Sequence, residues 1–470
     1  MFLQLNHLQG KSAAQTAQET VAAIYGLLAE GKISEAQFGK LRVQLDWLQY
    51  KQNFRDVVTA AGDGSFLDLR IDTRQIEGTD LKSCIQKAVA NEPSDRLALE
   101  NFCSFRKSVA WDYNRFYWSR LHEWEQATGK GYEQALPGGK SDGNVDDAIA
   151  DSALEFWQLL NDMEGKNQLP QEIFTLEIGV GTGTRCGNFV RLFRDIDRDK
   201  GTSYYPKLRV LMGDYSLDTL DLSRPAVQEH ISLCSFLALD AMNPLKTLSF
   251  LRHKLLYVHS TNMYDNLPTE EFVRRNGRLY LVETRLSLAR EAACAIAHKY
   301  EIAYDKLRWT TERLREIGPS FLGEHERGMA FWMDVWQAAR LEERLTAIEE
   351  LRDDPFPEHL NARTLDEILE NAPTDMRFHL SSGALQSFAN TLPLLHPRGY
   401  LQVQDIFVKD FHEYRLGFYG PGKLDGSIVN WINGAVLKEV AERLGYNVRF
   451  VPYKYRKGSK TSILYTSPRD

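Results

Sequence analysis

The chain has 470 residues, and its 57 lysines and arginines against 64 aspartates and glutamates give a formal charge of −7 at pH 7. This length exceeds one typical domain, and the charge provides no electrostatic footprint for duplex nucleic acid, which is therefore not favoured as a partner. No window approaches the ~18 apolar residues of a membrane span, so no membrane contact is expected. Five scattered cysteines without a C-x-x-C pair indicate reduced thiols in a cytoplasmic protein.

Residues 1 to 130 are predicted to form a mainly helical N-terminal region. Apolar residues at three- and four-residue spacing predict helices over residues 16–28 and 34–53. The alternation over 65–72 predicts one short strand with an exposed face. The aromatic run 111–118 either docks this region on the rest of the chain or walls a ligand pocket, and docking is the favoured interpretation.

The most informative segment is an apolar run, 173–178, that ends in a glycine-rich turn. The run has the character of a buried parallel strand, and a helical pattern follows at 185–193. Gly179, Gly181 and Gly183 let the backbone turn sharply and approach a ligand closely. A nicotinamide fingerprint would need glycine or alanine where Thr184 stands and an acid about 20 residues later, and neither is present.

Two further apolar runs also end in an acidic residue. Residues 208–213 lead to Asp214, and 235–239 lead to Asp240. A carboxylate at the tip of the second strand of a doubly wound sheet can accept from both hydroxyls of a ribose. Each acid alone has the alternative of a helix cap or a solvated turn. The order of the strand ends along the chain favours one ligand site instead.

The fourth apolar run, 255–259, opens into a polar loop over 260–268. In an open α/β sheet this loop would lie over the ligand crevice. The polar residues that could act there on a substrate are Asn262, Tyr264 and Asp265. Their alternative is a loop that merely shapes the rim.

The rest of the chain divides into a helical insertion, 286–375, and a C-terminal part, 376–470. The insertion is charged and is expected above the carboxyl ends of the strands, as a lid over the substrate or a dimerisation arm. The C-terminal part predicts a fifth strand at 400–407, a helix through 431–444, and two alternating runs at 447–453 and 462–466 that form a hairpin.

The pattern Glu-x-Gly-x-Gly-x-Gly at 177–183, with Asp214 and the pair Asp240-Ala241, resembles class I S-adenosylmethionine-dependent methyltransferases. The resemblance implies an α/β fold with a Rossmann-like doubly wound sheet that ends in an antiparallel hairpin. Residues 131–285 and 376–470 would be its two parts, with the N-terminal helical region and the helical insertion added. The cofactor would be S-adenosyl-L-methionine, held by Glu177, Gly179, Gly181, Thr182, Gly183, Asp214, Tyr215, Asp240 and Ala241.

A narrower stretch is similar to the MidA-like methyltransferases, which methylate a protein arginine. Asp265, Leu267, Pro268 and the run 272–275 match that family. The chain has Thr261-Asn262 where the family has Asn-Glu, so the carboxylate that would orient a guanidinium is missing.

These observations predict a methyltransferase acting on an oxygen or nitrogen of a small-molecule or protein acceptor. Asp265 is the preferred base, with Asn262 and Tyr264 beside it. The alternative is a non-catalytic protein of the same fold that serves assembly or interaction. A MidA-like arginine methyltransferase is third, and a nicotinamide oxidoreductase is more distant. No metal site is expected, and a homo-oligomer could form through the insertion.

Overall fold

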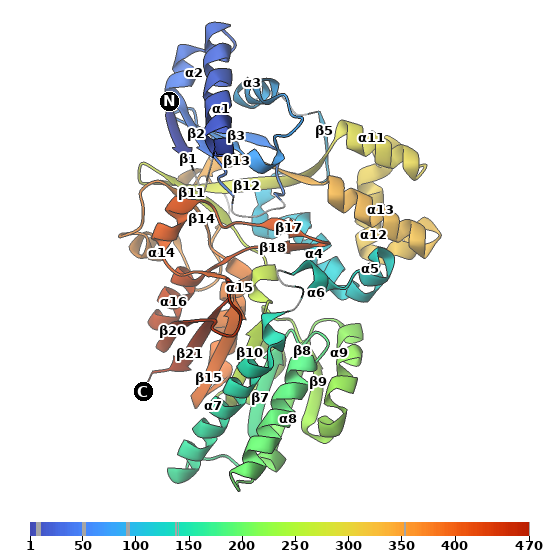
Figure 1. Cartoon of the computed structure of the whole chain (residues 1–470), viewed down its shortest axis with the longest axis vertical. Helices are drawn as coiled ribbons and strands as arrows, with labels where there is room; N and C mark the ends of the chain where they lie inside the picture. The colour runs from blue at the N-terminus through green and yellow to red at the C-terminus, as the bar shows by residue number, and fades with distance from the viewer. Residues whose placement is uncertain are drawn as a thin grey trace.

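The computed structural model describes residues 1–5, 11–48, 53–90, 95–136, 139, 141–351 and 354–469. Its chain forms two blocks, with a large parallel sheet in one and two smaller sheets in the other (Figure 1). A helical arm projects from the second block. Within the described ranges, no helix combines the length and apolar character needed to cross a bilayer.

The large sheet has seven strands in the order β20-β21-β15-β10-β7-β8-β9. The five strands from β15 to β9 are parallel, while β20 and β21 form an antiparallel pair at the opposite edge from β9. The strand order reverses between β7 and β10, and a reversal of this kind opens a crevice at the carboxyl ends of the strands. The strands are β7 (Ile173–Ile178), β8 (Leu208–Asp214), β9 (Cys234–Ala238), β10 (Leu255–Thr261), β15 (Leu395–Asp405), β20 (Tyr446–Pro452) and β21 (Ser462–Pro468).

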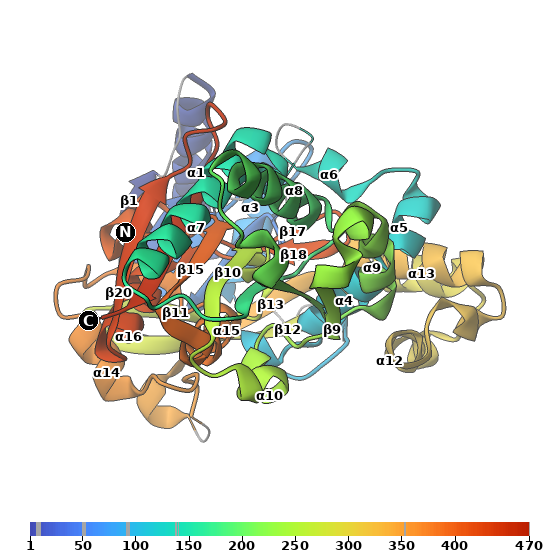
Figure 2. The same cartoon turned by 90° about the horizontal axis from the view of Figure 1, so that it is seen from below.

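Helices cover both faces of this sheet (Figure 2). On one face, α7 (Asp146–Gly165) and α8 (Thr184–Asp199) pack their aromatic residues over β7, β8 and β10. The other face is covered by α10 (Pro244–Leu248), α15 (Ser382–Thr391) and α16 (Gly434–Arg443). Burial on both faces explains why the parallel strands are continuous apolar runs in the sequence.

The chain leaves the large sheet after β10, and the last part of the predicted segment 131–285 enters a second sheet. A second sheet runs β13-β12-β11-β14, and two short strands pair with β12. The intervening turn 262–268 carries the chain from one sheet to the other. The second sheet comprises β5 (Arg96–Ala98), β6 (Cys103–Ser104), β11 (Glu271–Arg275), β12 (Arg278–Ala289), β13 (Arg340–Ala347) and β14 (Met376–His379).

The N-terminal region is less helical than the sequence pattern predicts. The predicted helix over 34–53 is wrong, because only α2 (Glu35–Lys40) is helical and β2 (Leu41–Leu45) follows at once; residues 49–52 lie outside the described ranges. In β2 buried Leu41, Val43 and Leu45 alternate with partly exposed residues, which is the period of a strand. A third sheet, β1-β2-β4-β3, results, with α1 (Lys11–Ala29) and α3 (Leu81–Ala90) packed on it; its other strands are β1 (Phe2–Leu5), β3 (Val58–Gly62) and β4 (Leu67–Ile71).

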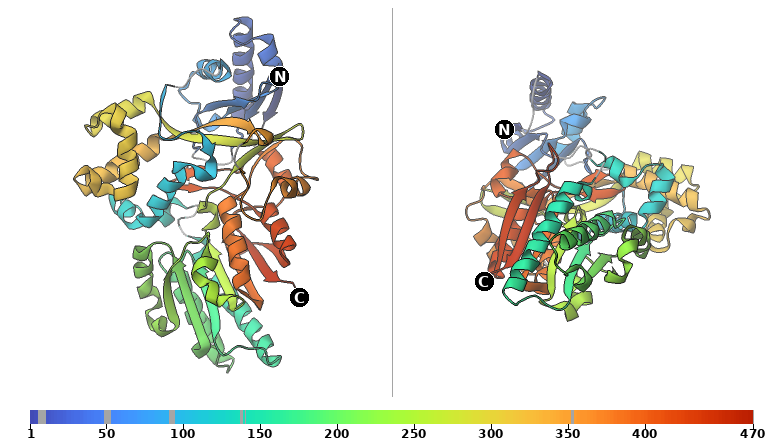
Figure 3. Two further views of the ribbon diagram at one scale, coloured as in Figure 1. Left: turned by 180° about the vertical axis from the view of Figure 1, so that it is seen from behind. Right: turned by 60° about the horizontal axis from the view of Figure 1, so that its bottom comes forward.

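The insertion contains strands as well as helices, because it includes the end of β12 and all of β13. Its helical arm is α11 (Arg290–Lys299), α12 (Leu307–Ile317) and α13 (His325–Ala338), and the shorter α14 (Ala362–Ile368) follows β13. The arm packs on α4 (Val109–Ser119) and α5 (Leu121–Thr128) (Figure 3). Trp332 of α13 lies at the centre of this contact, 4.5 Å from the Phe116 ring and 4.7 Å from Trp124.

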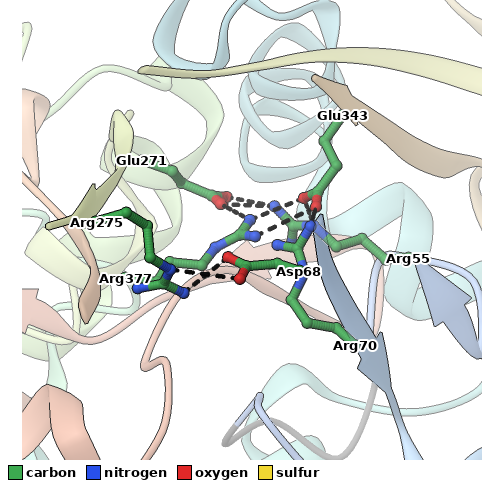
Figure 4. Close-up of polar contacts among 7 residues, drawn as sticks. All are labelled: Arg55, Asp68, Arg70, Glu271, Arg275, Glu343 and Arg377. Carbon is green, nitrogen blue, oxygen red and sulfur yellow. Dashed lines mark hydrogen bonds and ion pairs between the residues drawn. The ribbon is translucent and has the colours of Figure 1, made fainter. Parts of the chain in front are cut away.

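Buried ion pairs join the N-terminal sheet to the second sheet (Figure 4). Arg55 binds Glu271 at 2.6 Å and Glu343 at 3.0 Å, and Arg377 binds the same two carboxylates. Four arginines and three acids meet here from β4, β11, β13, β14 and the segment before β3: Arg55, Asp68, Arg70, Glu271, Arg275, Glu343 and Arg377. Because buried charges are tolerated only when they are paired, the network fixes how the two sheets meet.

Candidate functional site

Two adjoining cavities open where the parallel strands end. The smaller has a volume of about 610 Å³ and the larger about 1190 Å³. They share one wall, which consists of Trp118, Leu121, Gly179, Gly181, Thr219, Thr261 and Asn262. Residues from β7, β8, β10 and α4 therefore enclose one continuous site.

The glycine turn forms the floor of both cavities. Gly179, Gly181 and Gly183 have φ angles of 75°, 52° and 73°, which lie in the left-handed region that favours glycine. A Cβ at Gly183 would lie 2.8 Å from the Ser223 carbonyl oxygen, whereas nothing lies within 4 Å of a Cβ at Gly181. Thr182 lines the larger cavity, and its hydroxyl bonds to that of Thr184 at 2.9 Å. The turn thus leaves space above its backbone for a ligand.

Asp214 ends β8 and lines the smaller cavity. Burial raises its pKa to about 6, although the backbone N–H groups of Ser216, Gly181 and Tyr215 act in the opposite direction. No arginine, lysine or histidine of the described chain forms an ion pair with it. A buried carboxylate without a basic partner gains from ligand groups that donate hydrogen bonds, such as ribose hydroxyls.

Tyr215 and the next loop shape the rest of the smaller cavity. The Tyr215 hydroxyl donates to the Arg115 carbonyl oxygen on α4, so this side chain bridges the sheet and its cover. Asp240 and Ala241 also line the cavity. Asp240 is exposed, and both of its oxygens accept from its own turn, from Met242 N at 2.9 Å and Asn243 Nδ2 at 2.7 Å. It therefore acts at least as a turn cap, which is the alternative that the sequence leaves open.

Glu177 lies on the floor of the larger cavity and is paired inside the protein. Arg185 Nη1 donates to its carboxylate at 2.8 Å, and Arg185 Nη2 donates to the Tyr257 hydroxyl at 2.6 Å. Burial raises the pKa of Glu177, and the guanidinium opposes that effect. We did not predict Arg185 from the sequence, although it shares the buried face of α8 with Phe189 and Phe193, at spacings of four residues.

Of the three predicted catalytic residues, the structure places only Asn262 at the cavities. Asn262 lines both, and its Nδ2 donates to Ser141 Oγ at 3.1 Å. Tyr264 is 1% exposed and packs in the core of the large sheet. Asp265 is 6% exposed and lines neither cavity. It lies beside Asp405, whose carboxylate accepts from the Asp265 N–H at 3.3 Å, and burial raises the pKa of Asp265 to about 7.

The outer wall of the site comes from the segment between α4 and α7. Trp111 and Trp118 line the smaller cavity while they also belong to the aromatic core. The run 111–118 therefore both packs the N-terminal region on the rest of the chain and forms part of the cavity wall. Tyr132, which the sequence analysis did not single out, lines the larger cavity edge-on to Trp118, at 4.8 Å between ring centroids. The described residues of 286–371 line neither cavity, and the helical arm supports α4 and α5 from behind.

These features fit a nucleoside bearing an amino-acid tail. The smaller cavity offers an unpaired carboxylate, and the larger offers Glu177 and the open glycine turn. No group of three or more histidines, cysteines or carboxylates within the described ranges has the arrangement of a metal site.

No protein-family model matches the chain, and neither does any curated protein sequence. Solved structures do align with it by shape. An uncharacterized protein from Burkholderia thailandensis gives a TM-score of 0.43 at 12% identity, over 78% of this chain and 87% of that one. A likely methyl transferase of the same superfamily and organism, bound to S-adenosyl-homocysteine, gives 0.43 at 10%, over 78% and 88%.

A third neighbour is the 1,6-didemethyltoxoflavin-N1-methyltransferase of that organism, bound to its substrate and to S-adenosylhomocysteine. It gives a TM-score of 0.33 at 9% identity, over 80% of this chain and 95% of that one. The likeness to all three is one of shape.

Proposed function

We propose that this protein transfers a methyl group from S-adenosyl-L-methionine to a nitrogen or oxygen of a small-molecule or protein acceptor. One observation carries the proposal. Glu177 and the glycine turn at the end of β7, and Asp214 at the end of β8, surround a single site at the point where the strand order of the parallel sheet reverses. The sulfonium of the cofactor supplies the reactivity, so the protein must bind, align and exclude water.

In this proposal the adenosine occupies the smaller cavity. Asp214 would accept from the ribose hydroxyls, and Asp240 with Ala241 would lie beside the base. Glu177 would attract the ammonium of the amino-acid tail, and the backbone of the glycine turn would receive the carboxylate. Thr182 and Tyr215 would border the two ends of the ligand.

The larger cavity favours a cationic acceptor. Its carboxylates outnumber its arginines, and both arginines are already paired, Arg120 with Glu123 and Arg185 with Glu177. Its other acidic residues are Glu125, Glu133, Asp146, Asp218 and Asp221. Since a cleft of one charge sign concentrates ligands of the other, an amine or guanidinium nitrogen is the acceptor that we favour over oxygen.

Calorimetry with the whole chain tests the proposal. S-adenosylmethionine and S-adenosylhomocysteine should bind, and NADH should not. Binding of NADH alone would overturn it. Incubation with methyl-labelled cofactor and a panel of amines and peptides then separates an enzyme from a non-catalytic protein of this fold, which would bind cofactor without transferring label. Label on peptide arginine would favour the MidA-like alternative.

Self-association through the helical arm stays a prediction. Trp309 and Ile317 of α12 are 48% and 57% exposed. Sedimentation of the wild type beside Trp309→Ser would test whether two copies meet there.

A further inference from the structure

A continuous chain of hydrogen bonds runs beneath the glycine turn. On β10, His259 is in register with Glu177 on β7 and with Gln402 on β15, so the three side chains emerge on one face of the sheet. Glu177 binds Arg185, and Arg185 donates to Tyr257. The Tyr257 hydroxyl donates to Gln402 Oε1 at 2.6 Å. The same oxygen lies 3.0 Å from His259 Nδ1, which brings the chain to the histidine.

This arrangement fixes the tautomer of His259. Gln402 Oε1 can only accept, and the amide nitrogen of Gln402 is engaged with the Tyr465 hydroxyl at 3.0 Å. The Tyr257 hydroxyl is also 3.1 Å from His259 Nδ1, but its proton goes to Gln402 Oε1, which is closer at 2.6 Å, so His259 Nδ1 carries its own proton. In a neutral imidazole the other nitrogen is then an acceptor, so the Thr261 hydroxyl donates to His259 Nε2, at 2.6 Å.

The environment keeps His259 neutral. It is 1% exposed, and both burial and the nearby Arg185 charge lower its pKa well below the usual value. The groups that face it are Arg185 of α8, Glu177 of β7, Gln402 of β15, and Tyr257 and Thr261 on its own strand. Its Nε2 lone pair therefore accepts from Thr261, which lines both cavities.

We propose that Thr261 is a catalytic residue and His259 its positioning partner, and that together they accept the proton released during methyl transfer. Thr261 belongs to the wall that both cavities share, between the site for adenosine and the floor with Glu177. The transferable methyl group would lie at this junction. The inference rests on the proposed function and adds the proton acceptor, the role that the sequence analysis gave to Asp265, which lines neither cavity.

The acceptor first loses the proton of its cationic form to solvent. Its nitrogen then uses the freed lone pair to form a bond with the methyl carbon as the carbon–sulfur bond breaks, and the electron pair of that bond stays on sulfur. The acceptor's N–H proton passes to Thr261 Oγ1 while the Thr261 proton passes to His259 Nε2. The Arg185 charge then favours loss of the proton from His259 back through Thr261 to solvent.

Binding of sinefungin tests this placement without an acceptor. Sinefungin carries an amine where the cofactor carries its methyl group, whereas S-adenosylhomocysteine carries nothing there. A charged amine that donates to Thr261 Oγ1 should bind the wild type about tenfold or more tightly than S-adenosylhomocysteine. Thr261→Val should abolish this preference, because valine keeps the shape and removes the oxygen. Thr261→Ser should restore it.

Thr466→Val is the matched control, since Thr466 lies in the same sheet, is 1% exposed and has a hydroxyl without a hydrogen bond. It should keep the preference. Nitrogen NMR of the histidine-labelled wild type should show the Nδ1–H tautomer for His259, with an Nε2 shift that moves in Thr261→Val. A full sinefungin preference in Thr261→Val, or an Nε2–H tautomer, would overturn the inference. Failure of both ligands to bind the wild type would instead remove the proposed function, and this inference with it.

Discussion

At the scale of single residues, Asp214 carries a desolvation cost that hydrogen bonds from a ligand would offset. Its carboxylate is partly buried at the tip of β8 and receives only backbone N–H groups, and this burial raises its pKa to about 6. Burying an ionised group without a charged partner is unfavourable, and residues that bind ligands often carry such a cost. Stability and binding should therefore respond in opposite directions when this charge is removed.

Asp214→Asn should raise the melting temperature of the ligand-free protein at pH 7 and weaken the binding of S-adenosylhomocysteine by about 1 to 3 kcal/mol. The sign follows from linkage. Because the folded pKa lies above the unfolded value of 3.8, folding takes up a proton between these values, so the contribution of this group falls as pH rises from about 4 to 6. The gain from asparagine should therefore be larger at pH 7 than at pH 4.5.

Calorimetry and thermal denaturation check both effects, with Asp366→Asn on exposed α14 surface as the control, which should change neither. Equal affinities of the wild type and Asp214→Asn for S-adenosylhomocysteine would remove Asp214 from the site.

At the scale of elements, the strand ends could be predicted and the cover over them could not. Burial on both faces turns β7 and β8 into apolar runs, so their ends point directly to the glycine turn and to Asp214. Tyr132 and Trp118 reach the site only because α4, α5 and the short α6 (Tyr132–Ala135) fold back over the sheet, which local periodicity does not encode. Asp265 is polar and follows a strand, yet the chain turns inward there to cross between sheets, and its carboxylate lies beside Asp405.

The glycine turn and α8 should depend on close approach at Gly183. Its φ of 73° disfavours any side chain, and a Cβ would also meet the Ser223 backbone at 2.8 Å. Gly183→Ala should therefore lower the free energy of unfolding by more than the ~1 kcal/mol that backbone strain costs. It should also lower the affinity for S-adenosylhomocysteine about tenfold or more.

Gly201→Ala is the control, since its φ is 70° and nothing lies within 4 Å of its Cβ. This variant should lose only the stability that backbone strain costs, and it should bind S-adenosylhomocysteine with wild-type affinity. Urea denaturation and calorimetry measure both quantities. Identical behaviour of the two variants would show that close packing at Gly183 does not set the turn.

At the scale of the whole molecule, the second block holds the cover of the site in place. Asn114 of α4 donates to the Asn266 carbonyl oxygen and accepts from Ile428 N, so the cover is tied to the crossing between the sheets. The N-terminal sheet is tied to the same block through the network around Glu271 (Figure 4). Contacts thus connect the N-terminal sheet, through the second block, to the wall of the cavities.

Glu271→Gln should lower the free energy of unfolding by about 3 to 5 kcal/mol, because Glu343 would then be the one carboxylate of the described residues that pairs with both Arg55 and Arg377. Urea denaturation measures this loss. Glu367→Gln breaks partly exposed pairs with Arg363 and Arg443 and should cost less than about 1 kcal/mol. Similar values for the two variants would show that the network contributes no more than a surface pair.

The most direct measurement is a crystal structure of the whole chain with S-adenosylhomocysteine. The account predicts ribose hydroxyls within hydrogen-bond distance of Asp214, the amino-acid tail above the glycine turn toward Glu177, and the sulfur facing Thr261. A ligand bound outside the two cavities, or one whose ribose lies away from Asp214, would contradict it.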